Sequence, residues 1–214
     1  MNAYPKYRPA RSYNVADRVW PSRRIAAAPQ FVPVDLRDGN QAFARPMNVE
    51  TKIRYFKMLC AIGFKEIEVA YPAASSEEFE FVRRLIGENL IPQDVRIAVF
   101  TAARADLIDR TVAAIAGTDK ALIHCYIAAS DLHRQFVFGK TREELTAIAI
   151  ESTRRIADAV GQTEFRDCHY EFTPEEFSDS DVDYIVDLAE QVRAEWRPAH
   201  RNFIFNLPQT VERR

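Results

Sequence analysis

The feature that most constrains the fold of this chain is a regular alternation between short apolar runs and longer amphipathic stretches. The short runs are rich in β-branched and aromatic residues, as buried strands are, and they cover residues 31–36, 66–70, 96–101, 121–127, 168–172 and 202–207. Their starts lie roughly 34 residues apart, which suits one strand–helix unit. Strict alternation predicts parallel strands joined by right-handed crossovers.

The amphipathic stretches between the runs carry helix capping signals. Gly63 follows the first stretch, where a left-handed C-terminal cap belongs. Ser75 with Glu78, and Thr141 with Glu144, have the spacing of a capping box. We therefore predict five helices, over residues 53–60, 75–86, 104–115, 141–156 and, starting at Ser178 or Ser180, up to 192.

Residues 1–30 differ in composition from the rest of the chain. They hold six basic residues, with prolines at 5, 9, 21 and 29, and a single acid, Asp17. Organelle transit segments are also rich in arginine, but they are amphipathic and rich in serine, so a targeting role is disfavoured. We expect an irregular N-terminal arm over residues 1–30, with Trp20 as a packing anchor.

Six strands and five helices fit either an open doubly wound sheet or most of a (β/α)8 barrel. Residues 37–41 (RDGNQ) follow the first strand in place of a glycine-rich phosphate loop, which disfavours a dinucleotide or P-loop site. A closed barrel with this repeat needs about 270 residues after the arm, more than residues 31–214 provide. We therefore expect an α/β fold, an incomplete TIM barrel over residues 31–214.

The composition disfavours several functional classes. The chain is 47% hydrophobic and 28% charged, as folded proteins are, and its net charge of −2 gives no bias towards nucleic acid or membranes. No apolar run approaches the roughly 18 residues that a membrane helix needs. Cys60, Cys125 and Cys168 form no C-x-x-C pair. We expect reduced thiols, with Cys125 and Cys168 as core fillers, in a cytoplasmic protein that binds neither nucleic acid nor membranes.

Polar side chains interrupt the apolar runs near the strand ends at which parallel α/β folds bind ligands. Arg37 and Asp38 stand at the end of the first run. Polar residues of equal parity, which share a strand face, follow in the next runs: Glu66 and Glu68, His124 and Tyr126, and His169 and Glu171. The last run carries Asn206 and is followed by Thr210. Because buried charges normally pair or bind a metal, this set indicates a divalent cation and a polar organic acid. The alternatives are a turn ion pair for Arg37 with Asp38 and a hydrogen-bonded core histidine for His124.

Residues 35–42 (DLRDGNQA) resemble the signature of the α-isopropylmalate synthases, in their long-armed form. The similarity covers nearly the whole chain, and its other segments are residues 6–9 and 17–21 in the arm, 64–75, 130–134, 170–177 and 206–212. The RDG motif alone is shared with homocitrate synthase, citramalate synthase and hydroxymethylglutaryl-CoA lyase. The arm and residues 206–212 (NLPQTVE) make the resemblance more specific.

The resemblance implies a TIM barrel, a homodimer and a Claisen-type condensation. Acetyl-CoA would add to α-ketoisovalerate, giving 2-isopropylmalate and CoA in leucine synthesis. It implies a divalent metal (Mg, Mn or Zn) with Asp38 as a ligand, and Arg37 as support for the ketone oxygen. His124 and Thr210 would hold the keto acid, and Glu171 would belong to the acid/base network.

The sequence also departs from this family. The family's other metal ligands form an H-x-H pair, whereas the four histidines here stand at 124, 133, 169 and 200. Ala70-Tyr71 replaces the usual Gly-Phe. We therefore expect the N-terminal part of such an enzyme, from a truncated gene, that is inactive alone. The alternatives are a homocitrate or citramalate synthase type, and a non-catalytic or vestigial subunit whose open sheet docks on another polypeptide.

Overall fold

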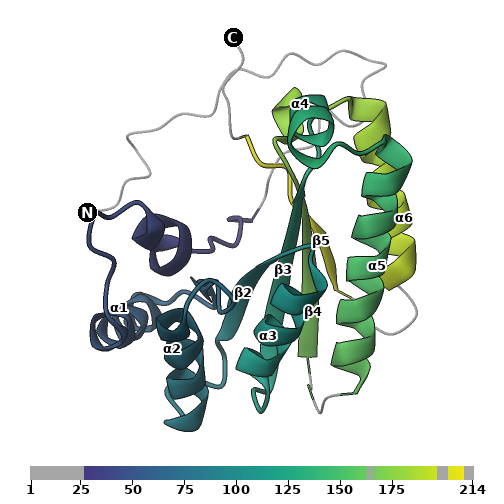
Figure 1. Cartoon of the computed structure of the whole chain (residues 1–214). Coiled ribbons are helices and arrows are strands. Elements are labelled where there is room, and N and C mark those ends of the chain that lie inside the picture. Colours follow the sequence, from purple (N-terminus) through teal and green to yellow (C-terminus); the bar gives the residue numbers. More distant parts are fainter. Residues whose placement is uncertain (1–26, 163–164, 166, 197–201, 210–214) are drawn as a thin grey trace, which may run out of the picture. The chain divides into compact units, whose positions relative to one another are not determined.

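A computed structural model describes residues 27–162, 165, 167–196 and 202–209, and the fold lies in the part from Val32 onward. Five parallel strands form its sheet: β1 (Glu66–Ala70), β2 (Arg96–Ala102), β3 (Lys120–Ala128), β4 (Asp167–Glu175) and β5 (Phe203–Phe205). They stand in chain order, β1-β2-β3-β4-β5 (Figure 1). A doubly wound sheet reverses its order at a switch point, so this order is that of a barrel wall.

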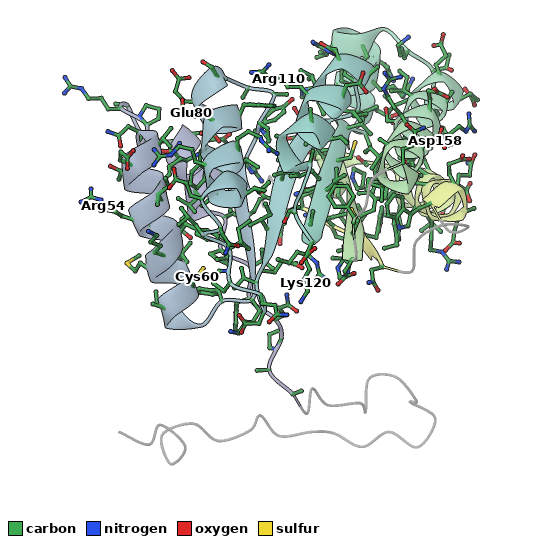
Figure 2. The ribbon with its side chains drawn as sticks, turned by 90° about the horizontal axis from the view of Figure 1, so that it is seen from below. Arg54, Cys60, Glu80, Arg110, Lys120 and Asp158 are labelled. Atoms are coloured by element: carbon green, nitrogen blue, oxygen red, sulfur yellow. The ribbon has the colours of Figure 1, made fainter. Side chains whose placement is uncertain are left out.

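The five predicted helices are all present. They are α1 (Val49–Ile62), α2 (Ser76–Gly87), α3 (Ala105–Ile115), α5 (Arg142–Gly161) and α6 (Val182–Trp196). Each packs against the next along the chain, as right-handed crossovers on one face of a sheet require. Figure 2 shows Arg54, Glu80 and Asp158 pointing away from the sheet on α1, α2 and α5, and all three are exposed.

The helix ends follow the capping signals closely. Gly63 ends α1 with a left-handed φ of 112°, and Thr141 and Glu144 form a complete capping box at α5. Ser75 caps α2 by accepting a hydrogen bond from the Glu78 backbone N–H at 3.2 Å. The Glu78 carboxylate binds Lys52 instead of closing the box. The sequence did not predict the short α4 (Asp131–His133) and the π-helical turn after it.

The predicted first strand, residues 31–36, is wrong. Residues Asp35–Gly39 form a π-helical turn, η1, and the preceding residues make one ladder-type hydrogen bond, from the Glu68 N–H to the Pro33 carbonyl at 3.0 Å. Pro33, within this segment, has no N–H to donate, which weakens the segment as a strand. The described residues therefore contain five strands, and β1 and β5 have one strand partner each, so this barrel wall is not closed.

The outer face of the sheet and the inner faces of the helices form the hydrophobic core. Tyr170, Phe172 and Trp196 are among its largest buried side chains. Cys125 and Cys168 are free thiols in this core, as predicted, and burial raises the pKa of each to about 12. None of the described helices is long and apolar enough to cross a membrane.

The predicted arm, with Trp20, falls almost entirely on residues 1–26, outside the described residues. The boundary between an arm at 1–30 and a barrel part at 31–214 therefore stays a prediction.

Candidate functional site

The inner face of the sheet is polar, and Arg37 reaches it from the η1 turn. Its Nε donates to Glu68 Oε1 at 2.5 Å, and its guanidinium lies 4.0 Å from the centre of the Phe100 ring. The Arg37 side chain is only 14% exposed. Arg37 therefore extends from the turn onto the sheet, and its ion pair with Asp38 at 2.9 Å is only part of its environment.

His124 lies at the centre of this face on β3. Its Nδ1 is 2.6 Å from Glu68 Oε2, and its Nε2 is 2.6 Å from the Thr173 hydroxyl. Both His124 and Glu68 are buried. Burial opposes the ionisation of Glu68, but the hydrogen bond from His124 and the charges of His124 and Arg37 outweigh it and lower the pKa of Glu68.

Glu171 on β4 is the second carboxyl group near His124. Its Oε1 lies 3.6 Å from His124 Nε2 and accepts a hydrogen bond from the Asn206 amide at 2.7 Å. Burial raises the pKa of Glu171, and the negative charge of Glu68 adds to this effect. The pKa values of the two carboxyl groups beside His124 are thus shifted in opposite directions. Such an arrangement suits one group to act as a fixed anion and the other as a proton carrier.

An aromatic cluster centred on Phe100 contacts both Arg37 and His124. Phe100 on β2 meets the His124 ring edge-on, with centroids 4.7 Å apart, and stacks on Tyr126 at 4.6 Å. Tyr71 packs edge-on against the same Phe100 ring at 5.5 Å. Tyr71, which stands where the family usually has phenylalanine, therefore belongs to this aromatic cluster.

Asp38 lies at the exposed rim of the site. Its carboxylate accepts from Arg37 and from the Gln41 amide at 2.5 Å, and its side chain is 53% exposed. Within the residues that the structure describes, no group of three His, Cys, Asp or Glu side chains could hold a metal ion. The described part of the chain therefore supplies one candidate ligand, and this set does not fit a divalent ion on its own. Thr210 lies outside the described residues.

Two other residues of the polar set belong to a different network, nearer the start of the strands. His169 contacts Asp167 at 3.1 Å and Asn202 at 2.6 Å, and Glu66 accepts from Arg96 at 3.2 Å. Burial and the charge of Arg96 lower the pKa of His169. The structure thus brings Arg37, His124 and Glu171 together and leaves His169 and Glu66 apart from them.

The sequence placed Glu68 in the polar set without a role of its own and did not single out Thr173 or Phe100, although all three lie in the site. Strand parity could have found Thr173, because it shares the face of Glu171, whereas Phe100 becomes apparent only through its register pairing with His124. The polar residues indicate which face of each strand belongs to the site. Predicting contacts between strands also requires their register, which a single sequence does not give.

Comparison with known proteins places this chain in a family. Residues 28–213 match the HMGL-like family, so the chain belongs to it. It is 45% identical over 99% of its length to 2-isopropylmalate synthase from Cupriavidus taiwanensis, and 47% identical over 97% to that from Ralstonia nicotianae. The chain spans 37% and 36% of the length of these two relatives.

Solved structures support the fold. An HMG-CoA lyase from Acenitobacter baumannii, in complex with coenzyme A and 3-methylmalate, aligns with a TM-score of 0.55 at 17% identity, over 81% of this chain and 55% of that one. The HMG-CoA lyase from Brucella melitensis aligns with a TM-score of 0.50 at 15% identity, over 84% of this chain and 71% of that one. At this identity the likeness concerns the α/β barrel fold alone.

Proposed function

We propose that this chain carries the keto-acid side of a Claisen-type condensing site. At such a site acetyl-CoA, α-ketoisovalerate and water give 2-isopropylmalate and free CoA, a step in leucine synthesis. One observation carries the proposal: a guanidinium, an imidazole and two oppositely shifted carboxyl groups converge on the inner face of a barrel wall. The named relatives support the choice of reaction.

Arg37 is suited to the ketone oxygen. Addition of a carbon nucleophile to a ketone places negative charge on that oxygen, and a preorganised cation in a shielded site stabilises this charge. The described contacts use the Arg37 Nε and one N–H on Nη1, out of the five N–H donors of a guanidinium. Further donors of Arg37 therefore suit a keto-acid oxygen.

Glu171 is suited to proton movement. A carboxyl group with a raised pKa holds a proton nearer neutral pH, where it can donate to or accept from a reacting group. His124, 3.6 Å away, would help to hold the keto acid, and Thr210 would complete this side of the site.

A divalent metal with Asp38 as one ligand, and a homodimer, are further parts of the proposal that derive from the family resemblance. Since the chain has no H-x-H pair, we propose that its 214 residues alone do not turn over substrate.

Two measurements test the proposal. In a thermal shift assay, α-ketoisovalerate should protect the chain more than pyruvate or 2-oxoglutarate does; the opposite ranking would favour a citramalate or homocitrate synthase type. In an assay of CoA release with acetyl-CoA, α-ketoisovalerate and Mg²⁺ or Mn²⁺, residues 1–214 should show no turnover. Robust turnover would overturn the claim of inactivity and would leave the substrate assignment intact.

A further inference from the structure

Glu68 is the residue through which Arg37 and His124 are connected. Each of its carboxylate oxygens has its own partner: Oε1 accepts from Arg37 Nε at 2.5 Å, and Oε2 lies 2.6 Å from His124 Nδ1. The side chain of Glu68 is only 4% exposed. Water therefore competes little for either contact.

Glu68 also ties the turn that carries Arg37 to the sheet. Its backbone N–H donates to the Pro33 carbonyl at 3.0 Å, just ahead of η1. The side chain and the backbone of one residue thus hold both ends of the short segment from Pro33 to Arg37. The remaining side-chain contacts of Arg37 that the structure describes are a local ion pair with Asp38 and the face of Phe100.

The same carboxylate determines where the His124 ring carries its hydrogen. The lowered pKa of Glu68 keeps it ionised at neutral pH, and an ionised carboxylate only accepts hydrogen bonds. His124 Nδ1 must therefore be protonated, whatever the charge of the ring. In the neutral ring, Nε2 then accepts from the Thr173 hydroxyl at 2.6 Å.

We propose that Glu68 is a positioning residue for the keto-acid site: it fixes the place of the Arg37 guanidinium and the Nδ1–H tautomer of His124. This inference rests on the proposed function, in which Arg37 and His124 bind the keto acid. Glu68 itself acts through them and carries no proton in the reaction.

Glu66 provides a matched control. It lies on the same strand and the same face as Glu68, and it is similarly buried, but its carboxylate accepts from Arg96. A general cost of removing a buried charge from β1 would appear in both variants. An effect at Arg37 and His124 should appear only in Glu68→Gln.

The test is an NMR comparison of the chain labelled with ¹⁵N in histidine and arginine, as wild type, Glu68→Gln and Glu66→Gln. Wild type and Glu66→Gln should show the Nδ1–H form of His124 and a slowly exchanging Arg37 Nε–H. Glu68→Gln should lose at least one of these signatures, because its single amide oxygen can accept from only one of the two residues. Glu68→Asp should keep both in part. Unchanged resonances of both residues in Glu68→Gln would overturn the proposal. If Glu68→Gln does not fold, Glu68→Asp is compared with wild type instead.

The binding of α-ketoisovalerate separates this inference from the proposed function. If wild type binds the keto acid, Glu68→Gln should bind it roughly tenfold more weakly or worse, with Glu66→Gln near wild type. Equal affinities in wild type and Glu68→Gln would overturn the positioning role. If wild type does not bind the keto acid while the spectra respond as expected, the proposed function fails and the role of Glu68 in holding Arg37 and His124 stands.

Discussion

Glu68 and Glu171 lie at opposite ring nitrogens of His124, 2.6 Å from Nδ1 and 3.6 Å from Nε2 respectively, and their pKa values are shifted in opposite directions. The difference arises from their partners. Glu68 has two cationic or donating neighbours, whereas Glu171 has one amide donor and lies near the charge of Glu68. Chemically identical side chains are therefore suited to different roles in one site.

Glu68→Gln should destabilise the fold at neutral pH by about 3 kcal/mol, since it leaves Arg37 without its buried counter-charge. Because the pKa of Glu68 is lowered by folding, its stabilisation is present above the unfolded-state pKa of about 4.3 and is lost as pH falls through the folded-state value. Urea unfolding at pH 7 and at lower pH values should thus show the two proteins converging in acid. A difference that grows on acidification would contradict the ion pair.

Glu171→Gln should have the opposite effect. Folding raises the pKa of Glu171, so its contribution to stability is present below about pH 4.3 and is lost as pH rises through the folded-state value. At pH 7 the neutral amide should therefore stabilise the fold by on the order of 1 kcal/mol, while the hydrogen bond from Asn206 is kept. Urea unfolding at pH 7 checks this, and a marked loss of stability would mean that Glu171 is held as a stable anion.

Phe100→Leu should weaken α-ketoisovalerate binding by roughly 1 kcal/mol or less, because it removes the aromatic face that supports the Arg37 guanidinium. Phe79→Leu is the matched control. The Phe79 ring lies 4.8 Å from the Arg110 guanidinium, and this pair is outside the site. Calorimetric titration of both variants makes the comparison. Equal losses would show that the effect is one of general stability.

Thr141→Ala should destabilise the chain by about 1 kcal/mol, since the Thr141 hydroxyl accepts from the Glu144 backbone N–H and completes the capping box of α5. Ser76→Ala is a suitable control, because the exposed Ser76 hydroxyl bonds only the neighbouring Glu77 side chain among the described contacts. Thermal unfolding of both variants tests the difference. A loss in Ser76→Ala as large as that in Thr141→Ala would count against the capping role.

The sequence predicted much of this fold because helix caps and strand composition are local. Gly63 and Thr141 act where their spacing placed them, and five of the six apolar runs are strands. The prediction for the run from Phe31 failed because its β-branched residues do not compensate for the N–H donor missing at Pro33. The order of the five strands distinguishes a barrel from a doubly wound sheet. Strand order depends on long-range pairing, so local sequence patterns could not predict it.

The convergence of the site residues was predictable, and their connections were less so. Arg37, His124 and Glu171 lie together as expected, while the role of each residue, including Asp38 and Thr210, stays a prediction. Glu68 could not be distinguished from Glu66 in the sequence, because the two share a strand face. They differ in their partners, which are Arg96 on β2 for Glu66 and His124 on β3 for Glu68. His169 shares a strand face with Glu171, yet it belongs to the network of Asp167 and Asn202.

The most direct test of the keto-acid site is a calorimetric titration of α-ketoisovalerate into wild type, Arg37→Gln and Arg110→Gln. Arg110 is the control because it also lies over a phenylalanine ring, but on the outer helices. We predict saturable binding to wild type and Arg110→Gln, and a loss of at least about tenfold in affinity in Arg37→Gln. Absence of binding to wild type, or equal affinity in Arg37→Gln, would contradict the assignment of this face of the sheet to the keto acid.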